Sequence, residues 1–143
     1  MRLIIPVTPM GAVRMTGRGK WVSPAAKRYL DYKTAVAWEA KRQAKLEVPI
    51  REPIRIVEIV YIMPIPKGGR ITYTENGRRR TRKVEPGDYH TSKPDIDNLF
   101  KGVTDALNGI IWEDDSQICE VGRQAKIYGH EPRIEIEIEE ASV

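Results

Sequence analysis

Apolar residues recur along this chain with two different spacings, and each spacing predicts one kind of element. Residues 3–7 form a short β-prone run, which Pro9 and Gly11 bring to an end. In residues 133–139 isoleucine alternates with glutamate, which predicts a strand with one buried face and one solvated face. Residues 54–63 are largely apolar at both odd and even positions, which indicates a central strand, and residues 118–128 are typical of a further strand.

Two other segments carry their apolar residues at helical spacing. The first, residues 25–46, follows Ser23 and Pro24, which suit the N-cap and the first helical position. The second, residues 94–109, begins with Asp95 in position to cap the helix and ends at the helix-terminating pair Asn108-Gly109. We expect Tyr32 and Trp38 of the first helix to pack in the core, although both are also candidates for a surface that joins two subunits.

Residues 64–92 differ from the rest of the chain because they are strongly basic and contain little apolar material. Two β-prone runs, 70–75 and 78–84, are joined by Asn76-Gly77, which suits a tight hairpin turn. We therefore predict an arm that projects from the core at about residues 64–92. The arm is interpreted either as a DNA clamp or as a disordered loop, and the sequence favours neither. Its candidate DNA-binding residues are Arg78, Arg79, Arg80, Arg82 and Lys83.

The order of these elements is β–α–β–(hairpin)–α–β–β. Strands joined by hairpins and mixed with two helices indicate an α+β fold, in which a small mixed β-sheet carries two helices packed on it. A chain of 143 residues has the length of one domain, so we expect a single domain over residues 1–143.

Composition changes this picture only slightly. The formal net charge is +4, which permits a nucleic-acid partner but does not require one. A second basic stretch, with Arg14, Arg18 and Lys20 among glycines, is either another phosphate-binding loop or an ordinary solvated loop.

The sequence also bears on the compartment in which the protein works. Cys119 is the single cysteine, so no intrachain disulfide is expected, and we predict that it is buried as a small hydrophobe. The first residues are too short an apolar run for a signal peptide, and no run approaches the ~20 apolar residues that span a bilayer. We expect a cytoplasmic protein without a membrane partner.

The most informative acids stand at the start of the second helix. Asp95 and Asp97 are two residues apart, and with Asp95 still extended after Pro94 both carboxylates can turn toward one point. Two converging carboxylates repel each other unless a cation lies between them, and Mg²⁺ prefers such oxygen ligands at about 2.1 Å. A third acid, Asp115 or Asp114, would arrive after the helix returns the chain.

Plainer interpretations of the same residues remain open. Asp95 can serve only as an N-cap worth about 1 kcal/mol, and Asp97 with Lys101 only as a surface ion pair worth about 0.5 kcal/mol. The Asp-x-Asp-Asn run also resembles the start of an EF-hand, but Leu99 occupies a ligand position and no glutamate closes the loop.

A longer pattern of residues is more specific than any of its parts. The run Pro94-Asp95-Ile96-Asp97-Asn98-Leu99 is followed by Lys101, then by Asp105-Ala106-Leu107, Trp112 and Asp114-Asp115. This composite resembles the signature of the RusA family of Holliday junction resolvases, strongly over residues 93–117 and elsewhere in the order of elements. The link between the helix and Trp112 is one residue shorter, and the basic arm is longer, than in the best-known member.

The resemblance implies a Mg²⁺-dependent endodeoxyribonuclease, and the sequence leaves open whether Mn²⁺ can substitute. It implies a homodimer that acts on branched DNA, with a four-way junction as substrate, and leaves 5′-phosphate ends. Carried onto this chain, the catalytic residues are Asp95, Asp97, Lys101 and Asp115. The metal ligands are Asp95, Asp97 and Asp115, with Asp114 as the alternative to Asp115. Two other functions stay open: a non-catalytic module that binds branched DNA, and a nuclease for flaps or other branched DNA.

Overall fold

The structure is a computed structural model that describes residues 1–14 and 23–141, so that the predicted DNA-binding residues Arg18 and Lys20 lie outside the described residues. The elements follow in the predicted order, with a short 3₁₀ helix, η1, added after the second α-helix. They are β1 (Arg2–Ile5), α1 (Pro24–Ala44), β2 (Ile54–Pro64), β3 (Arg70–Glu75), β4 (Arg78–Lys83), α2 (Ile96–Leu107), η1 (Asp115–Gln117), β5 (Ile118–Gly129) and β6 (Arg133–Glu140).

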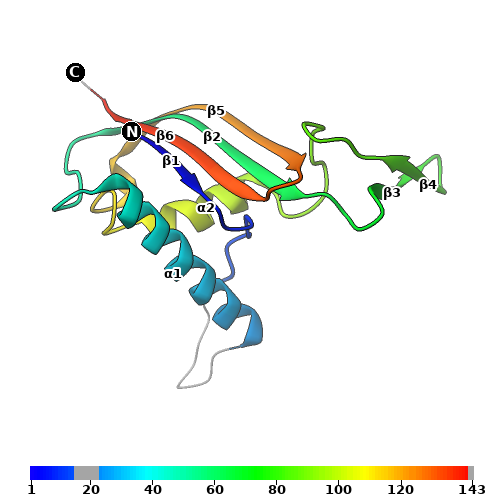
Figure 1. Ribbon diagram of the computed structural model, residues 1–143, viewed down its shortest axis with the longest axis horizontal. Coiled ribbons are helices and arrows are strands. Elements are labelled where there is room, and N and C mark those ends of the chain that lie inside the picture. Colours follow the sequence, from blue (N-terminus) through cyan, green and yellow to red (C-terminus); the bar gives the residue numbers. More distant parts are fainter. Residues whose placement is uncertain (15–22, 142–143) are drawn as a thin grey trace.

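The main sheet has four strands in the order β1-β6-β2-β5. β2 lies between β6, to which it is antiparallel, and β5, to which it is parallel, so the central strand and the mixed sheet are confirmed. Both helices lie on one face of this sheet (Figure 1). The fold is therefore α+β, as predicted.

The central strand changes sides part of the way along its length. Ile54 and Ile56 face the helices at even positions, whereas Ile59 and Tyr61 face them at odd positions. A bulge against β6 between Ile56 and Glu58 adds one residue and reverses the side on which the next side chains point. Both halves of β2 therefore contribute to a single core, and this explains why apolar residues occupy both parities.

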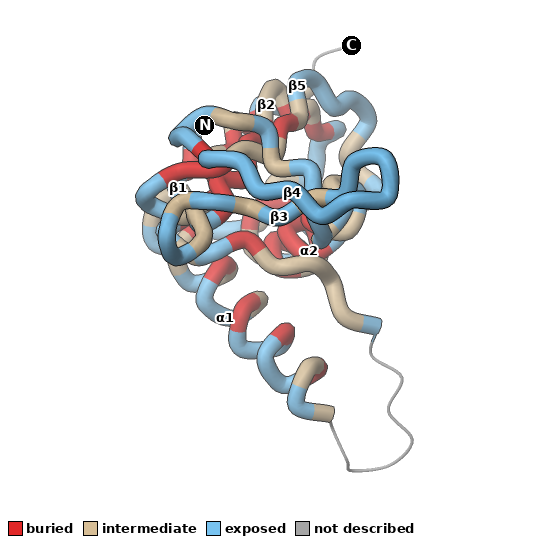
Figure 2. The backbone as a smooth tube through the Cα atoms, turned by 90° about the vertical axis from the view of Figure 1, so that its right-hand side faces the viewer, coloured by how far each residue is buried: buried red, intermediate tan, exposed pale blue. Residues whose placement is uncertain are grey.

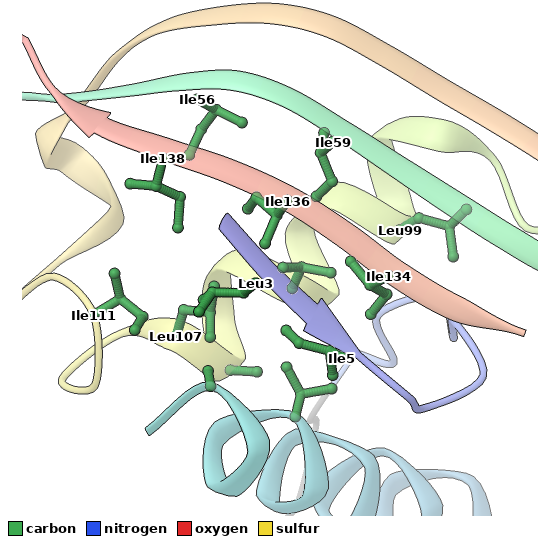
Figure 3. Close-up of a cluster of buried hydrophobic side chains, with 14 of the residues drawn as sticks. Leu3, Ile5, Ile56, Ile59, Leu99, Leu107, Ile111, Ile134, Ile136 and Ile138 are labelled. Atoms are coloured by element: carbon green, nitrogen blue, oxygen red, sulfur yellow. The ribbon is translucent and has the colours of Figure 1, made fainter. Parts of the chain in front are cut away.

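The core lies between the sheet and the two helices. The isoleucines of β6 that alternate with glutamate point into it, together with Leu3 and Ile5 of β1 and Leu99 and Leu107 of α2 (Figure 3). α1 begins as expected, because the Ser23 hydroxyl accepts a hydrogen bond from the Ala26 amide at 3.1 Å.

Trp38 and Cys119, both expected in the core, lie on the surface instead. Trp38 is 64% exposed, whereas Tyr32 is 6% exposed and packs as predicted. The buried stripe of α1 runs through Tyr32, Val36 and Ala40, one turn apart, and Trp38 projects from the opposite side of the helix. Cys119 is exposed because it lies in the first half of β5, which is the edge strand of the sheet and is largely exposed there.

β3 and β4 form a separate two-stranded sheet that extends beyond the end of the main sheet (Figure 1). Asn76 and Gly77 form its turn with φ angles of 51° and 76°, the left-handed values that a tight hairpin requires. Every residue of β4 is exposed (Figure 2). The hairpin is thus held together by its own strand pairing, and Val84 is buried at its base.

Candidate active site

The chain enters α2 through an extended residue, Asp95, with φ −68° and ψ 152°. Asp95 occupies the N-cap position, but its carboxylate makes no capping hydrogen bond and instead accepts one from the Lys93 ammonium at 3.0 Å. The prediction that Asp95 caps the helix is therefore wrong for its side chain. Its carboxylate stays on the surface, 59% exposed and close to the first turn of α2.

A groove between α2, η1 and β5 brings three of the four predicted catalytic residues together. Asp97 and Lys101 line it from α2, and Asp115 lines it from η1. Its volume is about 350 Å³, and the remaining lining residues are Phe100, Thr104, Ile118 and Val121. Asp95 lies outside this lining. The groove therefore places two carboxylates and one ammonium around a common space with partly apolar walls.

Trp112 explains how Asp115 reaches the groove. Its side chain is fully buried, and its indole N–H donates to the Asn108 side-chain oxygen at 2.8 Å. Its carbonyl accepts from the Gly109 amide at 2.7 Å, and Gly109 takes the left-handed φ of 78°. These bonds hold the chain in a tight turn after α2, which brings η1 back beside the helix.

The two neighbouring aspartates have different surroundings. The Asp114 carboxylate accepts from the Ser116 amide at 3.0 Å, and the Gln117 side chain accepts from the Asp114 amide at 2.9 Å, so Asp114 is the cap of η1. The hydrogen bonds from Ser116 lower the pKa of Asp114. Asp115 is the aspartate of the pair that faces the groove.

Lys101 forms its salt bridge with Asp105 and not with Asp97, the partner suggested by the sequence. Its ammonium lies 3.5 Å from the Asp105 carboxylate, and among the described residues Asp97 forms no salt bridge. The same Asp105 oxygen accepts from the Tyr29 hydroxyl of α1 at 3.0 Å. Burial, followed by this hydrogen bond, raises the pKa of Tyr29 above its usual range, so the phenol remains a donor. The plain Asp97–Lys101 surface pair is therefore replaced by a Tyr29–Asp105–Lys101 chain across both helices.

The donor set in the groove can be compared with what a magnesium ion requires. Over residues 1–14 and 23–141, no three acidic, histidine or cysteine side chains lie close enough together to hold a metal. Asp97 and Asp115 still offer two carboxylates to one groove, and Mg²⁺ commonly binds one or two carboxylates and keeps several waters. The set fits a two-carboxylate site, and the Asp95 carboxylate, which accepts a hydrogen bond from Lys93, lies outside the lining of the groove.

The N-terminal segment packs directly against the start of α2. The Ala12 amide donates to the Asn98 carbonyl at 3.2 Å, and a Cβ at Gly11 would lie 2.6 Å from the Asn98 side chain and 3.0 Å from Pro94. A side chain at position 11 would therefore displace the Asn98 amide group and crowd the Pro94 ring. Arg14 follows three residues later and is exposed, which places it within about 11 Å of Gly11 by chain length.

Two residues that support the groove have roles that the sequence analysis did not assign: Asp105 and Gln117. Asp105 was part of the quoted pattern and stands four residues after Lys101, but the sequence analysis paired that lysine with Asp97. The Gln117 amide donates to the carbonyls of Ile50 at 2.8 Å and of Glu52 at 3.1 Å, so it ties η1 to the loop before β2. Such contacts join distant parts of the chain, and periodicity carries no signal for them.

Among the described residues, no helix is long and apolar enough to cross a membrane.

The arm lies at the far end of the sheet from the C-terminus of α1 (Figure 1). The segment that follows the arm runs beside β5 and leads into α2. In this segment, the amides of Gly87 and His90 donate to the carbonyls of Tyr128 and Lys126.

Comparison with known proteins agrees with the pattern of acids. The chain is 38% identical over 135 residues to the uncharacterized protein YqaN of Bacillus subtilis (strain 168), a match that covers 94% of this chain and 87% of YqaN. Residues 5–139 match the family described as endodeoxyribonuclease RusA. That match spans nearly the whole chain, including the groove and the arm, and the protein therefore belongs to the RusA family of endodeoxyribonucleases.

Proposed function

We propose that this protein is a Mg²⁺-dependent endonuclease that resolves four-way DNA junctions by paired, symmetric nicks. The observation that carries the proposal is the groove in which Asp97, Lys101 and Asp115 meet, in a chain of the RusA family. Those residue types at one groove suit phosphodiester hydrolysis, which needs a metal-activated water and positive charge beside the phosphoryl group.

Each groove residue has a specific role in this proposal. Asp97 and Asp115 would hold the metal, and Asp95 would complete the ligand set when its carboxylate turns away from Lys93. A bound Mg²⁺, or Mn²⁺ in its place, supplies a Lewis acid for the scissile phosphate and a bound water of lowered pKa. Lys101, held at the rim by Asp105, offsets the negative charge that develops on the phosphoryl oxygens. Cleavage on the 3′-oxygen side leaves 5′-phosphate ends.

The arm is the main DNA-binding element in this proposal. Because side chains alternate along a strand, Arg78, Arg80 and Arg82 share one face of the hairpin, and Arg79 and Lys83 share the other. Both faces of the arm are therefore basic and exposed. A two-stranded ribbon fits the DNA major groove, which is about 12 Å wide, and its arginines can also contact the phosphates on either side. Arg14, exposed three residues after Gly11, provides a further phosphate contact, and the predicted DNA-binding residues Arg18 and Lys20 lie outside the described residues.

Two copies of the chain would act together. A four-way junction has two-fold symmetry, so two symmetric nicks require two identical sites related by the same axis. The Trp38 surface of α1 is the proposed contact between subunits, because this large side chain is 64% exposed. It borders a hollow of about 380 Å³ that is also lined by Pro6, Val7, Ala35, Asp31, Thr34 and Glu39.

A cleavage assay tests the proposal. Labelled four-way junctions, flaps and linear duplex are incubated with Mg²⁺ or with EDTA, using the wild type, Asp97→Asn and the control Glu47→Gln, which removes an exposed charge elsewhere. We expect paired symmetric nicks in the junction, lost with EDTA and in Asp97→Asn, and retained in Glu47→Gln. Binding of junctions without any cutting would instead make the chain a DNA-binding module, and cutting confined to flaps would make it a flap nuclease.

A further inference from the structure

Lys126 makes three hydrogen bonds to the short segment that leads into α2. Its ammonium donates to the carbonyls of Ser92 and Pro94, both at 2.7 Å, and its own carbonyl accepts from the His90 amide at 2.9 Å. The Ser92 and Pro94 carbonyls flank Lys93 and immediately precede Asp95. One side chain on β5 therefore holds the chain directly before the predicted metal ligands.

Lys126 is itself firmly anchored. It lies within β5, where it is paired with Tyr61 of the central strand β2, and its side chain is half-buried. Burial lowers the pKa of its ammonium, while the nearby Asp95 carboxylate acts in the opposite direction. A partly buried lysine that donates to two carbonyls holds the chain that carries them in place, because leaving those carbonyls unpaired would cost free energy.

The segment that it holds has few other restraints. Residues 91–94 have no helical or strand structure, and the Asp95 side chain does not cap the helix that follows. Ala12 and Gly11 contact Asn98 in the first turn of α2, and Gly11 also approaches Pro94. The chain around Asp95 and Asp97 is thus held by Lys126 and by the N-terminal segment.

We propose that Lys126 is a positioning residue for magnesium, which fixes the approach to α2 so that Asp95 and Asp97 can share one ion. The assignment rests on the proposed function. Supports behind metal ligands typically change metal affinity by about 10–100-fold when they are removed, without contacting the ion. The positive charge of Lys126 near Asp95 also reduces the mutual repulsion of the two carboxylates before the metal binds.

The test compares Lys126→Met, which keeps the apolar stem and removes the donors, with Lys126→Arg, which restores donors and charge. Lys41→Met, at an exposed lysine of α1, is the matched control. Magnesium binding is measured by calorimetry in the absence of DNA, and the Mg²⁺ concentration that gives half-maximal junction cleavage is measured separately. Junction affinity in EDTA and the melting temperature are recorded for each variant.

We expect Lys126→Met to weaken magnesium binding and to raise the half-maximal Mg²⁺ concentration by roughly tenfold or more. Cleavage at saturating Mg²⁺ and junction affinity in EDTA should stay within a few-fold of wild type, and Lys126→Arg should recover most of the loss. Should Lys126→Met not fold, Lys126→Gln, which keeps one donor, takes its place in the same measurements.

Two results would overturn the assignment while leaving the proposed function intact. The first is unchanged magnesium affinity in a folded Lys126→Met protein beside an active wild type. The second is a loss of junction affinity in EDTA as large as the loss of magnesium affinity, which would make Lys126 a phosphate contact. A wild type that neither binds magnesium nor cuts junctions would overturn the proposed function, and this assignment with it.

Discussion

The ammonium of Lys101 lies 3.5 Å from the carboxylate of Asp105, one turn further along α2, and not beside Asp97. Because Asp105 also accepts a hydrogen bond from the buried Tyr29, its carboxylate has a fixed position between the two helices. Lys101 is thereby held at the rim of the groove, with its charge available to a ligand, while Asp97 keeps its carboxylate free of that lysine.

This arrangement predicts that Lys101 and Asp105 affect the rate of cleavage to different degrees. Lys101→Met should slow junction cleavage at saturating Mg²⁺ by roughly 100-fold or more, because it removes charge at the transition state. Asp105→Asn should slow it less, since it only loosens the lysine. Tyr29→Phe removes the hydrogen bond that fixes Asp105, so it should slow cleavage no more than Asp105→Asn does and should cost about 1 kcal/mol in unfolding free energy. Equal rates for Lys101→Met and wild type would remove Lys101 from the mechanism.

The two aspartates of the 114–115 pair should respond differently to substitution. Asp115→Asn should abolish cleavage while preserving the melting temperature and strengthening junction binding, because a repulsive charge leaves the groove. Asp114→Ala should lower the melting temperature by removing the cap of η1 and should retain cleavage. Single-turnover cleavage and thermal melts distinguish the two variants, and the reverse pattern would make Asp114 the third ligand.

The arm should account for a measurable part of the salt dependence of DNA binding. Each phosphate contact contributes about 0.9 to the slope of log K against log salt, so Arg79→Ala with Arg80→Ala should flatten that slope by up to about 2. Lys27→Ala with Lys41→Ala removes the same charge from exposed positions on α1 and should leave the slope close to wild type. An unchanged slope in the arm variant would exclude the clamp.

Trp38 should determine the oligomeric state. Trp38→Glu places a charge on the proposed subunit contact and should convert a dimer into a monomer, as measured by light scattering after gel filtration. The fold should survive, because exposed positions usually contribute within about 0.5 kcal/mol to stability. Val48→Glu, at a site that is 69% exposed beyond the C-terminal end of α1 and outside the hollow beside Trp38, should remain dimeric. A dimeric Trp38→Glu protein would place the contact elsewhere.

His90 should make the stability of the protein depend on mildly acidic pH. Burial, and then the charge of Lys126, lowers the pKa of His90 below its ordinary value of 6.5, so the unfolded chain binds more protons there than the folded protein. Stability therefore rises with pH, and His90's contribution is present above about 6.5 and lost as pH falls through the lower folded value. His90→Phe keeps a ring against Tyr128, 4.7 Å away, and should reduce this dependence in thermal melts from pH 5 to 7.5.

Local patterns in the sequence were sufficient for most of the elements. The alternation in β6 and the Ser23-Pro24 start of α1 were predictable because strand alternation and helix capping depend on neighbouring residues. The bulge in β2 was not predicted, since it exists only in relation to β6. Gly122 shows the same limit: a Cβ there would lie 2.3 Å from the Val57 carbonyl on the neighbouring strand, a contact that no local pattern indicates.

The candidate site was predictable in its residues but not in its arrangement. Asp97, Lys101 and Asp115 meet at one groove, but the expected cap by Asp95 was wrong because Lys93 competes for that carboxylate. Whether Asp95 joins the other acids remains a prediction. Lys126 and Gln117 could not have been found, because the partners of each lie about 32 and 67 residues away along the chain.

The β3–β4 hairpin also sets a distance. Its paired strands of 6 residues each rise by about 3.3 Å per residue, whereas duplex DNA rises by about 3.4 Å per base pair. Because side chains alternate along a strand, two residues inserted in each strand keep the same arginines on the same face and move the tip outward by about 6.6 Å, the rise of about two base pairs. In the proposed complex with DNA, the length of the arm would therefore set the spacing between its DNA contacts and the cleavage groove, while the core stays the same.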